Sequence, residues 1–196
     1  MNTVALPSPL ELTVDLTDEQ FFHLCQQNSD FQFERTATGT LIIMPPTGGN
    51  TSRHNVKITT QLDLWNSETD LGEVFDSNGG FKLPNGAERS PDAAWLQRDR
   101  WDALAPEAQE RFVSLCPDFV IELPSPSDSL EKTQAKMQEY LENGARLGWL
   151  LDRRNQRVEI YRPGRAVEVL VAPKTLPGED VLPGFVLDLG PIFYRA

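Results

Sequence analysis

Two carboxylates in this chain stand where a β-strand would be expected to carry apolar residues. Glu122 lies in the run FVIEL (residues 119–123), and Asp92 immediately precedes the apolar run AAWL (residues 93–96). Burying a lone ionised carboxylate is costly, so each acid must be paired, bound to a metal, protonated or placed at an open strand end. Pro124 ends the first run, which favours a position for Glu122 at the end of its strand, at the rim of a cleft.

The two acids have the spacing of a shared cation site. The stretch between them is long enough for a strand, a helical connection and an adjacent strand. Two acids at the ends of neighbouring strands can share a hard cation such as Mg²⁺, which takes oxygen ligands and keeps several waters. The sequence therefore predicts Asp92 and Glu122 as ligands of Mg²⁺ or Mn²⁺, with the backbone carbonyl of Leu123 as a further ligand.

A helix predicted over residues 128–143 supplies a third partner. Its start and stop signals are Asp128 with Glu131 and Asn143 with Gly144. At about 100° per residue, one stripe of the helix is formed by Leu130, Thr133, Met137, Tyr140 and Leu141. Lys136 lies on the border of this stripe, whereas Lys132 points further towards solvent. We expect Lys136 to pack its stem against the protein and to place its ammonium near the two carboxylates.

Each of these residues also has a purely structural interpretation. Glu122 can form a buried ion pair with an arginine such as Arg89 or Arg146. Asp92 is also typical of a turn residue that begins a strand, and Lys136 is also typical of a solvated helix lysine. The combination of two acids and one lysine is more specific than any single member.

Composition limits the classes of protein to which the chain can belong. Its 196 residues carry a formal net charge of −11, which argues against a general nucleic-acid coat but allows a small basic cleft. No apolar run is long enough to span a membrane, and the N-terminus lacks the pattern of a signal peptide. The only cysteines are Cys25 and Cys116, without CxxC spacing, so a cytoplasmic protein without disulfides is expected.

The order of the predicted elements indicates an α+β fold. We expect a mixed central sheet with helices on both faces and additional β elements towards the N- and C-terminal ends, in one domain over residues 1–196. An extended arm is predicted over residues 1–15, followed by a helix that begins with a Thr17–Gln20 capping box. The stretches EVFDSNGGFKL and SPDAAWL are expected to be neighbouring strands, joined by the turn at residues 84–86.

Four segments resemble the Uma-type putative restriction endonucleases, a bacterial family of the PD-(D/E)XK nuclease superfamily. The segments are SPDAAWL, CPDFVIELPSPSD, KMQEYLENGARLGWLLD and LPGFVLDL. The resemblance implies a restriction endonuclease-like core with its active site at the strand ends. It matches Asp92 to the first acid of the signature and Glu122 to the second. The usual lysine position falls on Pro124, and Lys136 stands where superfamily members with a displaced lysine carry it.

From this resemblance we expect a Mg²⁺- or Mn²⁺-dependent endonuclease that hydrolyses DNA, with double-stranded DNA favoured. Its catalytic residues would be Asp92, Glu122 and Lys136. Arg53, His54 and Lys57 can lie near the phosphate backbone, although an exposed structural face is the simpler interpretation of these three residues.

Two other functions stay open. The first is a catalytically inactive nuclease-like binding or regulatory module, and the second is a metal-dependent hydrolase of a small phosphoester. A homodimer or a higher homo-oligomer is expected, because cutting both DNA strands commonly uses two active sites. The arm at residues 1–15 is suited to clasping a neighbouring subunit.

Overall fold

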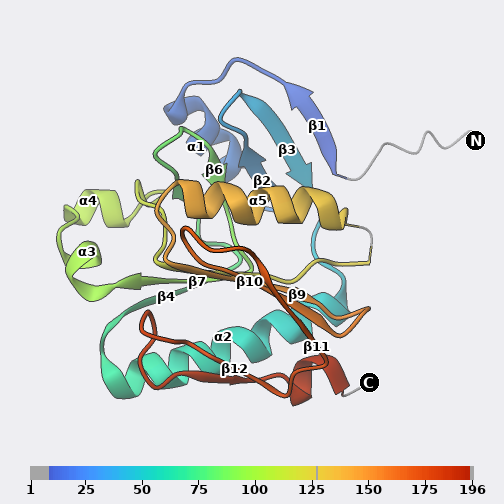
Figure 1. The fold of residues 1–196 in the computed structure, drawn as a ribbon. Helices are drawn as coiled ribbons and strands as arrows, with labels where there is room; N and C mark the ends of the chain where they lie inside the picture. The colour runs from blue at the N-terminus through green and yellow to red at the C-terminus, as the bar shows by residue number, and fades with distance from the viewer. Residues whose placement is uncertain (1–8, 127, 195–196) are drawn as a thin grey trace, which may run out of the picture.

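The computed structural model describes residues 9–126 and 128–194 (Figure 1). Within these residues the helices are α1 (Asp18–Gln27), α2 (Gly49–Thr69), α3 (Arg98–Asp102), α4 (Pro106–Gln109) and α5 (Leu130–Glu142), with a short π-helical turn, η1 (Gly190–Tyr194). None of the described helices is long and apolar enough to cross a membrane.

The central sheet has six strands in the order β11-β10-β9-β8-β7-β4. Their bounds are β4 (Gly72–Asp76), β7 (Ala93–Gln97), β8 (Phe119–Glu122), β9 (Leu147–Asp152), β10 (Arg157–Tyr161) and β11 (Glu168–Val171). β8 and β9 are parallel and the other neighbours are antiparallel, so the sheet is mixed as predicted. Because Ala93 pairs with Ile121, the start of β7 and the end of β8 lie at the same edge of the sheet.

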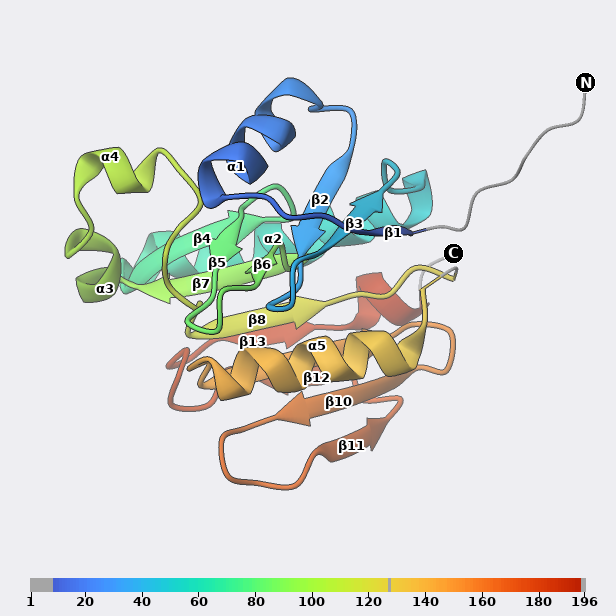
Figure 2. The ribbon, with the colours of Figure 1, turned by 90° about the horizontal axis from the view of Figure 1, so that it is seen from above.

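The two faces of the central sheet are covered by different helices, as Figures 1 and 2 show. Phe119 and Ile121 point into the core shared with α2, whereas Val120 points into the core shared with α5. This alternation along β8 follows from the pleat of a strand. It places Glu122 on the α5 face, against another layer of the protein and not in open water.

The α2 face is completed by C-terminal β elements. β12 (Thr175–Pro177) and β13 (Val186–Asp188) form an antiparallel pair. Side chains of this pair, of its connection and of η1 join the α2 core. The predicted short β pieces at the C-terminal end are therefore present, and they close the side of the sheet opposite α5.

A smaller five-stranded sheet lies beside α5 (Figure 2). Its strands, in spatial order, are β1 (Leu10–Thr13), β3 (Thr40–Met44), β2 (Gln32–Arg35), β6 (Glu88–Arg89) and β5 (Phe81–Lys82). α1 precedes β2 and begins with the predicted capping box, in which Thr17 and Gln20 exchange hydrogen bonds.

One detail of the sequence interpretation is wrong. The turn at residues 84–86 joins β5 to β6 of the smaller sheet. The two stretches that we expected to be neighbours meet in the central sheet through β4 and β7. The arm predicted over residues 1–15 contains β1, an edge strand of the smaller sheet that pairs with β3 of its own chain. Residues 1–8 of the arm lie outside the described residues. The α+β class itself is confirmed, and the single domain over residues 1–196 stays a prediction.

Candidate active site

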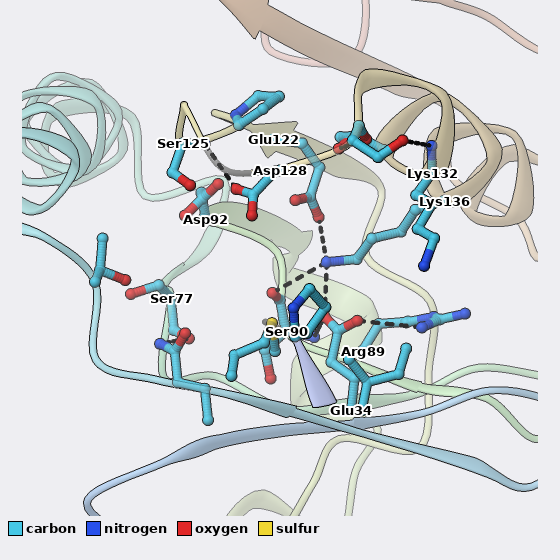
Figure 3. Close-up of a pocket in the computed structure, with 18 of the residues that line it drawn as sticks. Glu34, Ser77, Arg89, Ser90, Asp92, Glu122, Ser125, Asp128, Lys132 and Lys136 are labelled. Carbon is cyan, nitrogen blue, oxygen red and sulfur yellow. Dashed lines mark hydrogen bonds and ion pairs between the residues drawn. The ribbon is translucent and has the colours of Figure 1, made fainter. Parts of the chain in front are cut away.

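A cavity of about 520 Å³ lies between the smaller sheet, the end of β8 and α5 (Figure 3). Its lining includes all three residues selected from the sequence, Asp92, Glu122 and Lys136. Glu34 of β2 faces them from the smaller sheet. The lining also includes five apolar residues, Pro9, Ile42, Met44, Pro45 and Pro46.

Glu122 is buried, with 7% of its surface exposed. Its Oε1 lies 2.8 Å from Nζ of Lys136 and accepts a 3.1 Å hydrogen bond from the hydroxyl of Tyr140. The pKa of Glu122 is raised to about 7, because burial and the carboxylates of Asp92 and Glu34 raise it by more than Lys136 lowers it. A carboxyl group with this pKa exchanges its proton near neutral pH.

The alternative pairing of Glu122 with an arginine is wrong. The guanidinium of Arg89 contacts Glu34 and Glu139. The guanidinium of Arg146 lies 4.0 Å from Asp118, away from the cavity. Both arginines are therefore directed to other acids, and the ion-pair partner of Glu122 among the described residues is the helix lysine.

Asp92 is held from two sides. Its Oδ1 accepts a 2.7 Å hydrogen bond from Nδ2 of Asn55 in α2. Its Oδ2 accepts a 2.8 Å hydrogen bond from the backbone N–H of Leu123. Burial raises the pKa of Asp92, and these hydrogen bonds together with Lys136 act in the opposite direction. The side chain therefore connects the first turns of α2 to the end of β8, which a simple turn residue would not do.

Lys136 bridges two glutamates. Its Nζ lies 2.6 Å from Oε1 of Glu34 and 2.8 Å from Oε1 of Glu122, and its side chain is only 16% exposed. Burial alone would lower the pKa of Lys136, but the two carboxylates raise it above its ordinary value. The side chain is therefore a buried ammonium, and the alternative of a solvated helix lysine is wrong.

The start of α5 differs slightly from the prediction. Ser129, and not Asp128, is the N-cap residue, and its hydroxyl accepts from the backbone N–H of Lys132. Asp128 instead accepts a 2.7 Å hydrogen bond from the backbone N–H of Ser125. Asp128 thus organises the loop that follows β8 beside the cavity (Figure 3).

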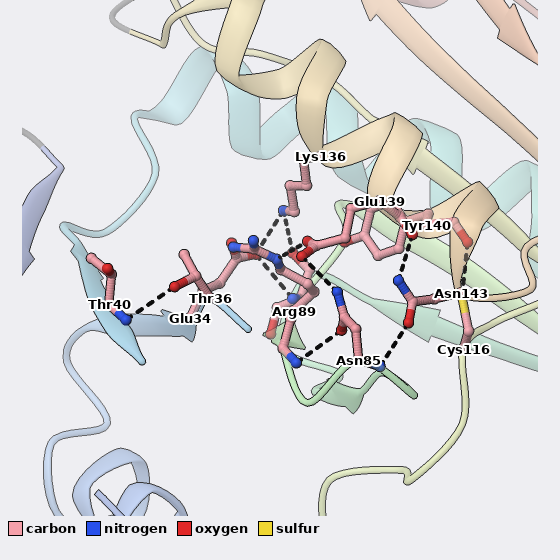
Figure 4. Close-up of polar contacts among 12 residues, drawn as sticks. Glu34, Thr36, Thr40, Asn85, Arg89, Cys116, Lys136, Glu139, Tyr140 and Asn143 are labelled. Atoms are coloured by element: carbon pink, nitrogen blue, oxygen red, sulfur yellow. Dashed lines mark hydrogen bonds and ion pairs between the residues drawn. The ribbon is translucent and has the colours of Figure 1, made fainter. Parts of the chain in front are cut away.

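Glu34 is the site residue that the sequence interpretation missed. It is 3% exposed, and its Oε1 accepts a 3.0 Å hydrogen bond from the backbone N–H of Ser90. Its Oε2 lies 3.1 Å from Arg89, whose Nε lies 2.6 Å from Oε2 of Glu139 on α5 (Figure 4). Burial opposes ionisation, but Lys136 and Arg89 lower the pKa of Glu34. Glu34 is therefore an ionised acid that ties the smaller sheet to the active-site lysine.

The oxygen atoms around Asp92 fit a hard cation. Asp92 and Glu122 line the same cavity and supply carboxylate oxygens. Two carboxylates that repel each other across one space are oxygen ligands that a hard cation and its waters fit. The described residues contain no group of three or more His, Cys, Asp or Glu side chains arranged around one point, so such a cation would keep several waters.

The simpler interpretation of Arg53, His54 and Lys57 put all three on an exposed face, and the structure agrees for only two of them. His54 is 2% exposed and packs inside the protein. Arg53 and Lys57 are partly buried on the same two turns. The structure therefore places His54 within the fold and leaves the two cations at its surface.

Comparison with known proteins gives two matches and one absence. The model of the family Uma2, described as a putative restriction endonuclease, matches residues 18–190. A crystal structure of a putative nuclease belonging to DUF820 from Anabaena variabilis is similar, with a TM-score of 0.72 and 22% sequence identity. The similarity covers 82% of this chain and 89% of the Anabaena chain, and at this identity it shows the fold alone. No curated protein matches the chain.

Proposed function

Because the chain belongs to the Uma2 family of putative restriction endonucleases, we propose that it is a metal-dependent endonuclease that hydrolyses DNA phosphodiester bonds. The observation that carries the proposal is the contact between Glu122 and the ammonium of Lys136 in a cavity that also contains Asp92. Two acids and a lysine around one space are the groups that phosphodiester hydrolysis needs.

The cation ligands in this proposal are oxygen atoms at the edge of the central sheet. Asp92 and Glu122 would hold Mg²⁺ or Mn²⁺, with the carbonyl of Leu123 as a further ligand. A bound divalent cation supplies a water of lowered pKa and polarises a phosphate oxygen. The hydrogen bonds from Asn55 and Leu123 fix the carboxylate of Asp92 before substrate arrives, which is the role of groups that orient metal ligands.

Lys136 has an electrostatic role in this mechanism. Its raised pKa keeps it protonated, so it cannot accept a proton from the attacking water near neutral pH. A fixed ammonium next to the reacting phosphate stabilises the negative charge that grows in the transition state. Glu34 is a positioning residue, since its carboxylate holds Nζ of Lys136 at 2.6 Å from the opposite side.

Pro124 stands at the position where the superfamily signature usually has its lysine, two residues after Glu122. Pro124 lines the cavity but has no charged group. The ammonium that the usual position would provide instead reaches Glu122 from α5, as the 2.8 Å contact shows. The absence of a lysine two residues after Glu122 is therefore no obstacle to the proposed chemistry.

The test is cleavage of plasmid and duplex oligonucleotides by the purified protein with Mg²⁺ or Mn²⁺. We expect wild-type cleavage to be lost with EDTA and to fall at least about 100-fold in Glu122→Gln and Lys136→Ala. Lys132→Ala is the matched control, because Lys132 lines the same cavity one turn earlier on α5 but pairs with Glu11 and not with Glu122. Equal cleavage by wild type and by the two active-site variants would indicate a contaminating nuclease and overturn the proposal.

A second candidate is hydrolysis of a small phosphoester. The cavity volume of about 520 Å³ favours it, since it lies within the range of small-molecule sites. Nucleotides and an activated phosphodiester, tested beside DNA with the same variants, separate the two substrates. Turnover of the small ester that depends on Glu122, without any DNA cleavage, would replace the endonuclease proposal.

We also propose that the protein acts as a homodimer or higher homo-oligomer, since two active sites are needed to cut both strands together. Sedimentation of the protein with and without a duplex measures this directly. A monomer that makes only single-strand nicks would contradict it.

A further inference from the structure

Two cations near the candidate active site differ from most others in the described chain. Most arginine and lysine side chains contact a carboxylate, as Arg89, Arg98 and Arg162 do. Arg153 and Lys57, by contrast, form no ion pair with a carboxylate among the described residues. Exposed cations without an acid partner occur elsewhere in the described chain, but Arg153 and Lys57 act on the same buried histidine, His54.

The parallel pairing of β8 and β9 determines where Arg153 lies. Arg153 directly follows β9, so it emerges at the same sheet edge as Glu122. Its Nη1 lies 2.9 Å from Nδ1 of His54, and its Nη2 donates to Oγ1 of Thr51 at 3.4 Å. Thr51 also lines the cavity, and Asn55 on the next turn of α2 holds Asp92. The guanidinium of Arg153 therefore contacts a residue that lines the active-site cavity.

Like charges gather around His54. Burial lowers the pKa of His54, and the positive charges of Arg153, Arg53 and Lys57 lower it further. Burial likewise lowers the pKa of Arg153, with a contribution from Arg53. Cations that repel each other without a carboxylate between them are stabilised when an anion binds.

The surrounding backbone adds to the attraction for anions. Arg153 reaches Thr51 on the first turn of α2, a helix of 21 residues whose first turn contains no acidic side chain, and Lys57 lies further along the same helix. The N-terminal end of a helix presents backbone N–H groups and the positive end of its dipole. The turn after β9 and the start of α2 therefore present positive charge beside the two active-site acids.

We infer that Arg153 and Lys57, with the first turns of α2, bind a phosphate of the nucleic-acid strand next to the one that is cut. This inference rests on the proposed function and adds a backbone-binding subsite to it. The contact is to phosphate, so it contributes affinity and salt dependence but no sequence preference.

The test is binding of a fluorescent duplex oligonucleotide in EDTA, followed by anisotropy at several NaCl concentrations. We expect Arg153→Gln and Lys57→Gln to weaken binding about tenfold each and to lower the salt slope by about 0.9 per lost phosphate contact. Arg165→Gln and Lys174→Gln are matched controls, since both side chains are exposed, neither lines the cavity, and neither has an ion pair among the described residues. The controls should leave affinity and salt slope within about twofold of wild type.

The outcomes separate this subsite from the proposed function. If wild type cleaves DNA but the Arg153 and Lys57 variants bind like the controls, the subsite is wrong and the endonuclease stands. If wild type neither binds nor cleaves DNA, both are wrong. Competition with inorganic phosphate distinguishes a free-phosphate site, because a variant that loses phosphate affinity but keeps DNA affinity also overturns the subsite.

Discussion

The backbone N–H of Leu123 donates a 2.8 Å hydrogen bond to Oδ2 of Asp92. Because Leu123 follows Glu122 directly, this bond fixes the side chain of one acid to the strand end that carries the other. Asn55 holds the remaining oxygen of Asp92 from α2. The geometry of the two acids thus depends on the sheet register and on one helix side chain.

Asn55→Ala should weaken metal binding, although neither Asp92 nor Glu122 is substituted. Loss of the 2.7 Å hydrogen bond frees Asp92 to rotate, and groups that orient a ligand typically contribute 10- to 100-fold to metal affinity. Calorimetric titration with Mn²⁺ measures the change. Thr59→Ala, one turn further along α2, is the control because its hydroxyl bonds to a backbone carbonyl and not to Asp92. Equal affinity in the two variants would contradict the orienting role of Asn55.

Glu34→Gln should damage both stability and activity. Removing this buried charge leaves Lys136 with Glu122 alone and Arg89 with Glu139 alone, so we expect the free energy of unfolding to fall by about 3 kcal/mol. Cleavage should fall more than about tenfold at temperatures where the variant is folded, because Lys136 loses the carboxylate that positions it. Urea unfolding and the plasmid assay measure the two effects.

Glu11→Gln is the matched control for Glu34→Gln. Glu11 also pairs with a lysine of α5, but both side chains are largely solvent-exposed. An exposed pair contributes at most about 1 kcal/mol, and this one includes neither Lys136 nor Glu122. If both glutamine variants behaved alike, Glu34 would have no special connection to the site.

The protonation of Glu122 predicts a pH dependence of stability in metal-free protein. Its pKa is about 7 in the folded protein, against 4.5 for an ordinary glutamate. The folded state therefore binds this proton more tightly than the unfolded chain does. Its contribution, up to about 3 kcal/mol, is fully present below pH 4.5 and is lost as the pH rises through about 7.

Urea unfolding in EDTA from pH 5 to pH 8 measures this contribution, with Glu122→Gln as the reference that cannot titrate. The stability difference, wild type minus Glu122→Gln, should decrease as the pH increases. Mn²⁺ should reverse the trend, because a cation competes with the proton for the same carboxylate. A difference that does not change with pH would show that Glu122 is ionised throughout.

The sequence was sufficient to predict the parts of the site that depend on local patterns. Alternation along β8 placed Glu122 on the face away from Phe119 and Ile121, and the helical period placed Lys136 at the border of the buried stripe of α5. Both relationships depend on residues that are close in the chain. Their geometry is therefore set by one strand or one helix.

Glu34 could not be predicted from the sequence, because its contacts are with residues that are far away in the chain. In the stretch FQFER it is a polar residue of an ordinary hairpin strand. It becomes part of the site only because the smaller sheet packs beside α5, which brings it to Ser90 and Lys136. The same packing explains the wrong assignment of the turn at residues 84–86, since local turn signals do not reveal which sheet a short strand joins.

The lysine of position 136 can be moved to position 124, where the signature usually has it. Pro124 follows Glu122 by two residues and lines the same cavity, so a lysine there is directed towards the space that Lys136 fills. In the Lys136→Ala background, adding Pro124→Lys should therefore recover about tenfold of the roughly 100-fold loss in cleavage. Pro126→Lys in the same background is the control, since Pro126 is exposed and does not line the cavity. Recovery by Pro124→Lys alone would show that the reaction needs an ammonium beside Glu122, whichever element supplies it. Recovery by both variants, or by neither, would contradict that requirement.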